Sequence, residues 1–274
     1  MSFRLAVITD LHFGTRTRFR GKLRKVADAA PALTNAFVQR MNGSIHPDLV
    51  LALGDFIEDE SHDADLARYR ECVRVLRQLT CPLRFAAGNH DTIHLRDDDL
   101  RAIWQHDGAL HYSFDTNGYH VCVLRTVERP LRDVTLPADQ LAWLEQDLAS
   151  TTLPTVVAMH HSAADQDLRG NPWFEHAPHL ALIDRRDILR AAIAASGKVV
   201  LVVNGHVHWN HVDLHDGIPY VTVQSLTENV DDDEPGRAAA AWGVFRIDDR
   251  AVSVVIEGEQ PLRFTQHTKH GSWR

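Results

Sequence analysis

The sequence predicts an α/β protein, α+β in part, built as a four-layer αββα sandwich in which two packed mixed β-sheets have helices outside. Three observations predict this class. Short apolar runs recur, and each ends at a polar cluster, as strands buried on both faces do. Segments with helical spacing of apolar residues lie between these runs, and strand-like segments without helices follow late in the chain. We expect a single domain over residues 1–274, with 210–274 as its C-terminal strands and tail.

The apolar runs give the expected strands in chain order. Buried strands are expected at 5–9, 49–53, 83–87, 155–159 and 199–203. Asn117-Gly118 favours a tight turn and predicts a hairpin over 112–124. Later strands are expected at 219–225, 242–247 and 252–256, and we expect them to form a second, more antiparallel sheet.

Apolar residues at helical spacing predict the helices between these strands. The expected helices are 22–41, 64–79, 97–106, 137–149 and 184–195. Pro31 either splits the first of them or starts a second helix. The acidic segment Asp231–Gly236 is interpreted as a solvated surface loop. The tail from Phe264, with His267, His270 and Trp273, is expected to be disordered or to contact another subunit.

Composition excludes several classes of protein. Apolar residues make up 44% and charged residues 24%, which is typical of a globular domain. With 29 basic and 37 acidic residues the net charge is −8, so nucleic acid and membrane are not expected partners. No apolar run approaches the length of a membrane span, and the first residues lack the features of a signal peptide. Three cysteines without a C-x-x-C pair favour a reducing, cytoplasmic location.

Histidine is abundant, with 18 residues in 274, and several histidines follow the expected strands. The residues collected at these strand ends are Asp10, His12, Asp55, Asn89, His90, His160, His206 and His208. Carboxyl ends of parallel strands meet at one edge of a sheet, so we expect these side chains to converge. Imidazole and oxygen donors without a thiolate suit Mn, Fe, Co or Zn. Because positions i and i+2 of a strand point the same way, Asp10 and His12 are expected to bind one ion together.

The order of these motifs resembles that of the calcineurin-like metallophosphoesterases, closest to the branch of class III cyclic-nucleotide phosphodiesterases and glycerophosphodiesterases. The motifs are Asp10-x-His12, Gly54-Asp55, Gly88-Asn89-His90-Asp91, His160 and Gly205-His206-x-His208. They cover residues 10–208. One departure is Ser162, which stands after His160-His161 where this branch usually has proline, so the loop 162–180 is where a different substrate would be held. Trp173 and Phe174 in that loop either stack on a nucleobase or pack in the core or at an interface.

The resemblance implies a role for each matching position. One metal ion would be held by Asp10, His12, Asp55 and His208, and the other by Asp55, Asn89, His160 and His206. His90 would lie near the substrate phosphate and either protonate the leaving oxygen or stabilise the charged transition state. Asp91 is expected to support the ligands from behind. His161, His94 and His176 are further candidates for supporting a ligand or contacting substrate. The glycines of the motifs are expected to let tight turns bring ligands close to the ions.

The function expected from these residues is that of a phosphodiesterase with two divalent or mixed-valence metal ions. It would hydrolyse a small phosphodiester, either a 3′,5′-cyclic nucleotide or a glycerophosphodiester, by attack of metal-bound hydroxide on phosphorus. Two dications and two carboxylates leave the site about +2, enough to attract a phosphodiester to an acidic chain. A nuclease of the same superfamily is the alternative, with the basic cluster at 16–25 facing phosphates. The third hypothesis is a non-catalytic scaffold that keeps the fold but has lost its metals. The expected assembly is a homodimer.

Overall fold

The computed structural model of the protein describes residues 2–129 and 131–267, and two six-stranded sheets lie at its centre. The first contains, in spatial order, β16 (Leu262–His267), β15 (Ala251–Glu257), β14 (Trp242–Ile247), β1 (Phe3–Ile8), β4 (Leu49–Ala52) and β5 (Leu83–Phe85). The second contains β12 (His211–His215), β13 (Ile218–Thr222), β11 (Val199–Asn204), β10 (Thr155–Ala158), β7 (Tyr119–Val123) and β6 (Tyr112–Thr116). Each sheet has both parallel and antiparallel pairs, so the prediction of two mixed sheets is confirmed.

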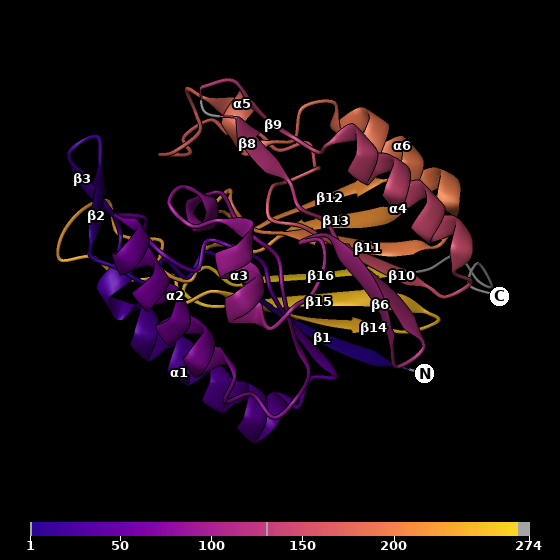
Figure 1. Ribbon diagram of the computed structural model, residues 1–274, viewed down its shortest axis with the longest axis horizontal. Helices are drawn as coiled ribbons and strands as arrows, with labels where there is room; N and C mark the ends of the chain where they lie inside the picture. The colour runs from indigo at the N-terminus through magenta and orange to yellow at the C-terminus, as the bar shows by residue number, and fades with distance from the viewer. Residues whose placement is uncertain (1, 130, 268–274) are drawn as a thin grey trace.

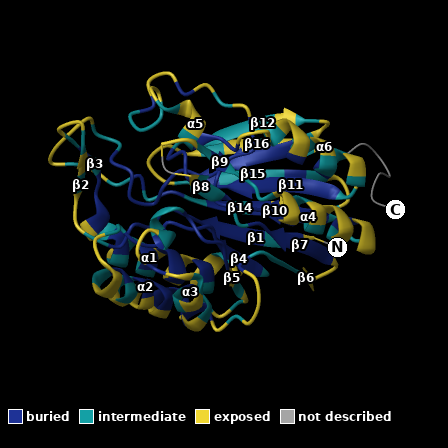
Figure 2. Cartoon of the chain, turned by 45° about the horizontal axis from the view of Figure 1, so that its top comes forward, coloured by how far each residue is buried: buried dark blue, intermediate teal, exposed yellow. Residues whose placement is uncertain are grey.

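Helices cover the outer face of each sheet (Figure 1). The helices over the first sheet are α1 (Ala30–Arg40), α2 (His62–Leu76) and α3 (Asp97–Trp104), and those over the second are α4 (Ala138–Ser150) and α6 (Arg186–Ser196). Three apolar cores follow from this layering: one beneath α1, α2 and α3, one between the sheets, and one beneath α4 and α6. In Figure 2 the strands are buried while the helices turn exposed faces outward. The four-layer αββα sandwich is therefore confirmed.

Apolar composition explains the central strands. Every residue of β4, β7, β10 and β11 is buried, as is every residue of β1 except Arg4, because each of these strands has a neighbour layer on both faces. β1 pairs in parallel with β4, and β10 pairs in parallel with β11. All of these strands therefore end at the same side of the sandwich, and the loops that follow them form that side.

Two predicted elements differ from the structure. Residues 22–25 form the strand β3 (Lys22–Lys25), which pairs with β2 (Thr17–Phe19), and helix α1 begins only at Ala30. Pro31 lies in the first turn of α1, where its missing N–H leaves no helix hydrogen bond unmade. The late strands do not form a second sheet of their own, because β14 pairs antiparallel with β1 and extends the first sheet.

The predicted disordered tail is also partly wrong. Residues 262–267 form β16, which pairs along its whole length with β15. His267 ends this strand, and the strand contributes Leu262 and Phe264 to the core between the sheets. His270 and Trp273 lie outside the described residues.

The acidic segment Asp231–Gly236 is a surface loop, as predicted, with residues 232–235 exposed, and it also packs on the hairpin formed by β2 and β3. Lys22 forms an ion pair with Asp232, and Arg18 forms one with Glu234. The backbone N–H of Leu23 also donates to Asp233 at 2.9 Å. The hairpin therefore carries most of the basic cluster predicted at 16–25, and the acidic loop neutralises it.

An ion pair network attaches α6 to the loop that follows β10. Asp165 accepts hydrogen bonds from Arg186 Nε at 2.8 Å and Arg190 Nη1 at 2.9 Å. Burial opposes ionisation of Asp165, but these hydrogen bonds keep its pKa below the ordinary value of 3.8. A carboxylate whose folded pKa is depressed stabilises the fold above its unfolded pKa, and loses that contribution as the pH falls through the folded value.

We therefore expect Asp165→Asn to destabilise the protein at pH 7 but to have little effect near pH 2. Urea unfolding of both chains at a series of pH values measures this difference. The matched control is Asp63→Asn, which changes a fully exposed carboxylate on α2. A penalty for Asp165→Asn that stays constant from pH 7 to pH 2 would show that the charge of Asp165 does not contribute.

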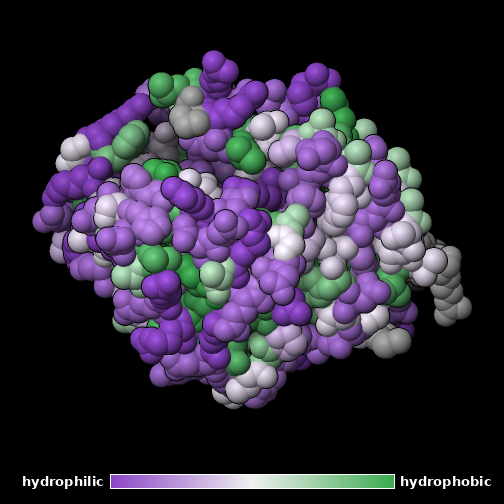
Figure 3. All heavy atoms as spheres, viewed as in Figure 1, coloured by the Kyte–Doolittle hydropathy of each residue, from purple (hydrophilic) through white to green (hydrophobic). Residues whose placement is uncertain are grey.

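The face of the molecule that Figure 3 shows is mostly hydrophilic, and its hydrophobic residues lie in small groups. The large hydrophobic residues exposed among the described residues are Ile93, Leu131, Ile188 and Leu214. They come from separate elements, as is common on globular proteins. No described helix has the length and apolar character needed to cross a membrane. The homodimer stays a prediction.

Candidate metal centre

The side chains predicted to bind metal converge where the parallel strands end. They follow β1 (Asp10 and His12), β4 (Asp55), β5 (Asn89), β10 (His160) and β11 (His206 and His208). Six of these seven are buried. The side chains therefore converge where the rule for the carboxyl ends of parallel strands placed them.

The first group of donor atoms surrounds His12. Its Nε2 atom lies 3.3 Å from Nε2 of His208 and 3.9 Å from Oδ2 of Asp55. Nε2 of His208 lies 3.4 Å from Oδ1 of Asp10. These four side chains are the ones that the resemblance assigns to one ion.

The second group surrounds His160. Its Nε2 atom lies 3.1 Å from Oδ1 of Asn89, 3.2 Å from Oδ2 of Asp55 and 3.2 Å from Nδ1 of His206. These are the side chains that the resemblance assigns to the other ion. Oδ2 of Asp55 belongs to both groups, which is the position that a bridging carboxylate requires.

The donor atoms fit divalent ions of the Mn, Fe, Co and Zn type. Ligand bonds of about 2.1 Å place neighbouring donors roughly 3.0–3.5 Å apart around a metal, and most of the separations in both groups fall in that range. Oδ1 of Asp10 is fully buried and accepts no hydrogen bond from a described residue, which leaves a carboxylate oxygen for a cation. The donor set contains nitrogen and oxygen only, as predicted.

Each of the four histidine rings makes a hydrogen bond through the ring nitrogen that points away from the other donor atoms. The acceptors are Glu58 for His12 at 3.1 Å, Leu53 O for His160 at 2.7 Å, Leu180 O for His206 at 2.9 Å and Glu228 for His208 at 2.6 Å. Such acceptors orient each ring, so that its inner nitrogen would face a bound cation. Burial and the charge of Lys25 lower the pKa of His12 to about 4, which keeps this ring in the neutral form that binds metal.

Sequence reasoning missed Glu58 and Glu228. Glu228 follows β13, a parallel neighbour of β11, so the rule that located the ligands also applies to it. Glu58 lies in the loop after β4, three residues beyond Asp55. Burial would raise the pKa of Glu58, but the hydrogen bond from His12 and the charge of Lys25 hold it well below its usual range. Glu58 is therefore a charged acceptor behind His12, and Glu228 accepts a hydrogen bond from His208.

The backbone at five predicted ligands has a positive φ angle. The values are 52° at Asp10, 47° at His12, 51° at Asp55, 70° at His206 and 60° at His208. Left-handed backbone is uncommon outside glycine and costs free energy, so its concentration here marks a site that the surrounding fold holds in place. The strand argument for Asp10 and His12 was wrong, since β1 ends at Ile8 and both residues are left-handed. Asp10 and His12 belong to the same group of donor atoms because the loop after β1 has this left-handed conformation.

Close approach explains the glycines beside the ligands. A Cβ atom on Gly88 would lie 2.1 Å from Oδ1 of Asp55, and one on Gly205 would lie 2.4 Å from Oδ2 of Asp10. Either side chain would displace a carboxylate. The predicted role of these glycines thus agrees with the distances.

We expect Gly88→Ala to reduce the activity of the protein about 100-fold, because a shift of about 1 Å would misplace the Asp55 carboxylate, which both donor groups share. Metal content after dialysis should fall with it. Gly43→Ala is the matched control, since nothing lies within 4 Å of a Cβ there. Equal activity of the two variants would show that this contact is tolerated.

His90 lies at the rim of the cluster and is paired with a carboxylate that sequence reasoning also missed. Its Nδ1 atom contacts Asp59, and its backbone N–H donates to Oδ1 of Asp55 at 2.9 Å. Burial lowers the pKa of His90, but the charge of Asp55 and the hydrogen bond to Asp59 outweigh burial and raise it. His90 can therefore hold a proton near the donor atoms.

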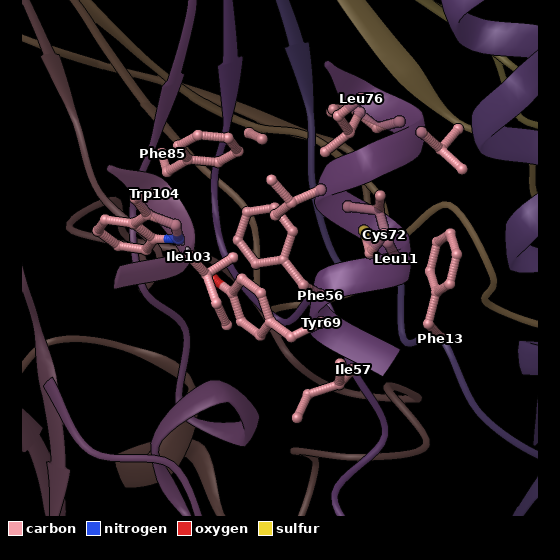
Figure 4. Packing of buried hydrophobic residues seen from close by; sticks show 14 of the residues in the cluster. Leu11, Phe13, Phe56, Ile57, Tyr69, Cys72, Leu76, Phe85, Ile103 and Trp104 are labelled. Atoms are coloured by element: carbon pink, nitrogen blue, oxygen red, sulfur yellow. Dashed lines mark hydrogen bonds between the residues drawn. The ribbon is translucent and has the colours of Figure 1, made fainter. Parts of the chain in front are cut away.

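Asp91 lies behind the cluster and joins two loops. Its carboxylate accepts backbone hydrogen bonds from Asp55 at 2.9 Å, Phe56 at 2.8 Å and Gly88 at 2.8 Å. Phe56 in turn packs on Tyr69, and the hydroxyl of Tyr69 accepts a hydrogen bond from Trp104 (Figure 4). The core beneath α2 and α3 thereby fixes the residue next to the shared carboxylate.

A buried lysine and an aromatic pair cover one side of the cluster. Lys25, only 2% exposed, pairs with Glu58 at 2.6 Å and lies over the ring of Trp173. Trp173 stacks on Phe19 and donates its indole N–H to Glu228 at 3.0 Å. Of the two interpretations of Trp173, the structure favours packing.

The remaining candidates separate into one buried and two exposed histidines. His161 is fully buried against His206, with ring centres 4.1 Å apart, and its Nδ1 atom contacts the Thr126 hydroxyl at 2.7 Å. Its Nε2 atom has no hydrogen-bond partner among the described residues. His94 and His176 are exposed.

A four-layer αββα sandwich with imidazole, carboxylate and amide donors at the ends of its parallel strands defines a class of metal-dependent phosphoric ester hydrolases. Residues 3–210 match the calcineurin-like phosphoesterases, and the chain belongs to that family. A relative from Synechococcus sp., named "Probable cyclic nucleotide phosphodiesterase", is 31% identical over 210 residues, which are 76% of this chain and 74% of the relative. A relative of the same name from Psychrobacter arcticus is 22% identical and covers 80% and 78%.

Solved structures share the fold. A dimetal phosphatase from Danio rerio superposes with a TM-score of 0.75 at 13% identity, over 97% of this chain and 99% of that one. A purple acid phosphatase from yellow lupin gives a TM-score of 0.68 at 13% identity, over 100% of this chain and 55% of that one. These likenesses show that the sandwich is common to the three proteins.

Proposed function

We propose that the protein is a phosphodiesterase that uses two metal ions and hydrolyses a small phosphodiester. The observation that carries the proposal is the sharing of Oδ2 of Asp55 between two complete groups of donor atoms. The names of the curated relatives favour a 3′,5′-cyclic nucleotide as substrate, and a glycerophosphodiester is the second candidate. Mn, Fe, Co and Zn all suit the donors.

When bound, the ions would polarise the phosphoryl oxygens and lower the pKa of a water molecule. The side chains of the protein would hold the ions in place and supply the proton for the leaving group. Asp10, Asp55 and the imidazoles hold the ions, and Glu58 and Glu228 hold the imidazoles from outside. His90 donates a proton to the oxygen that leaves phosphorus as the bond from water to phosphorus forms. Asp59 keeps the His90 ring in place through Nδ1.

A substrate panel tests this function. Chelator-treated protein is reloaded separately with Mn²⁺, Fe²⁺, Co²⁺ and Zn²⁺ and assayed on bis(p-nitrophenyl) phosphate, 3′,5′-cyclic nucleotides, glycerophosphodiesters and p-nitrophenyl phosphate. We expect diesters to be cleaved faster than the monoester, with a cyclic nucleotide as the best natural substrate. Absence of diester hydrolysis with all four metals, or cleavage of the monoester alone, would overturn the proposal.

The two alternatives have less support. A nuclease needs a basic track for the nucleic acid backbone. Here the basic hairpin is paired with the acidic loop, and Lys25 is buried on Glu58. A scaffold without metals would lack ligands, whereas the chain has every predicted one. Metal analysis of the purified protein separates the enzyme from the scaffold.

A further inference from the structure

A second cluster of metal-binding side chains lies beneath α4. His120 and Cys122 are two residues apart on β7, so both face α4, while Val121 and Val123 face the other sheet. Asp147 reaches them from α4. Cys122 is completely buried and His120 is 6% exposed, in an otherwise apolar layer that includes Leu144 and Leu148. Polar groups buried in an apolar layer cost free energy unless they form hydrogen bonds or bind a metal ion.

The three side chains meet at one carboxylate oxygen. Oδ2 of Asp147 lies 2.8 Å from Nε2 of His120 and 3.1 Å from Sγ of Cys122. The three donor atoms lie within 4.8 Å of one another. Bonds of about 2.0–2.3 Å to a tetrahedral ion need donors roughly 3.3–3.7 Å apart, so a shift of a few tenths of an ångström would admit one.

Two further groups hold this cluster from outside. Oδ1 of Asp115 lies 2.6 Å from Nδ1 of His120, and Ser113 donates its hydroxyl to Oδ1 of Asp147 at 2.7 Å. A histidine that binds zinc usually donates its other N–H to a carboxylate, which orients the ring. Asp115 has this position on His120, and the second ring nitrogen of His120 faces Cys122 and Asp147.

We propose that His120, Cys122 and Asp147 bind one Zn²⁺ ion and thereby tie the hairpin of β6 and β7 to α4. Thiolate, imidazole and carboxylate are the donors that Zn²⁺ prefers, and water completes the tetrahedron. Without metal, His120 donates to carboxylates from both nitrogens and is therefore charged. Binding of the ion releases one proton from the thiol and one from His120, so the net charge of the buried cluster is unchanged.

This site is separate from the centre proposed for catalysis. His120 pairs with Thr155, five positions before His160, which corresponds to about 16 Å along the strand. The two clusters also differ in chemistry, since only the one beneath α4 contains a thiol. The proposal therefore stands or falls independently of the phosphodiesterase activity.

Cobalt substitution tests the site, because thiolate bound to Co²⁺ gives a charge-transfer band in the near ultraviolet that nitrogen and oxygen ligands do not give. Reduced, chelator-treated protein is titrated with CoCl₂. We expect a band that reaches its maximum within three equivalents, because the two groups of donors proposed for catalysis also take up Co²⁺. The band should be lost in Cys122→Ser and retained in Cys72→Ser and Cys81→Ser. Zn²⁺ added afterwards should remove it by displacing Co²⁺.

A variant that keeps all the ligands gives a second measurement. Asp115→Asn should weaken Co²⁺ binding about 10-fold or more, because it removes only the charge behind His120. If Cys122→Ser does not fold, this loss of affinity in Asp115→Asn carries the test. Absence of the band in the wild-type protein, or a band that persists in folded Cys122→Ser, would show that the cluster is a hydrogen-bonded network without metal.

Discussion

Asp55→Asn is expected to lower kcat/KM for a phosphodiester by 1000-fold or more. Oδ2 of Asp55 lies 3.2 Å from Nε2 of His160 and 3.9 Å from Nε2 of His12, so one oxygen serves both donor groups. An amide has no charge with which to bind two cations, and the transition-state stabilisation that such ions give is worth several kcal/mol. Elemental analysis after dialysis should find at least one metal ion fewer per chain.

Unfolding of this variant distinguishes a lost ligand from a damaged fold. Burial raises the pKa of Asp55, but the charges of His160 and His90 outweigh burial and hold that pKa well below its usual range, so the carboxylate stabilises the metal-free fold. The chelator-treated variant should therefore unfold at a lower temperature than chelator-treated wild type, in a single cooperative transition and with an unchanged circular dichroism spectrum. Asp63→Asn, at an exposed position on α2, is the control for activity. Full retention of two tightly bound ions by Asp55→Asn would contradict the bridging assignment.

His90→Ala is expected to lower turnover 100- to 10,000-fold while both ions stay bound. His90 is held by Asp59 and is absent from both donor groups, so its loss removes a proton donor without emptying a metal position. The loss should depend on the leaving group. A nitrophenolate leaves without protonation, whereas a sugar alkoxide needs a proton, so the penalty should be larger for a cyclic nucleotide than for bis(p-nitrophenyl) phosphate.

The control for this prediction is His62→Ala, which removes an exposed imidazole on α2. Metal analysis accompanies both variants. An equal penalty on the two substrates would assign His90 to stabilising charge and not to proton transfer. Loss of metal from His90→Ala would instead make His90 a ligand.

The candidate site could be found from sequence because one topological rule governs it. Buried strands are recognisable as apolar runs, parallel strands end together, and polar residues directly after them must meet. His160 and Asn89 meet at 3.1 Å for this reason, although no pattern within either segment indicates the other.

The parts that sequence did not predict depend on contacts that only the folded chain creates. Lys25 is buried because Glu58 and Trp173 lie beside it, and the three residues come from separate segments of the chain. A strand that contains two lysines has no apolar period, so Lys22–Lys25 resembled the start of a helix. The pairing of Asp59 with His90 is of the same kind, because nothing in the chain distinguishes it from the neighbouring Glu58.

The position of β1 has a consequence for synthesis of the protein. This strand leads into Asp10 and His12, and it lies between β4 and β14, so its second neighbour is the segment Trp242–Ile247. During translation the first predicted metal-binding residues leave the ribosome long before that partner exists. The nascent chain therefore cannot complete the sheet that orients them until the segment Trp242–Ile247 has also been made.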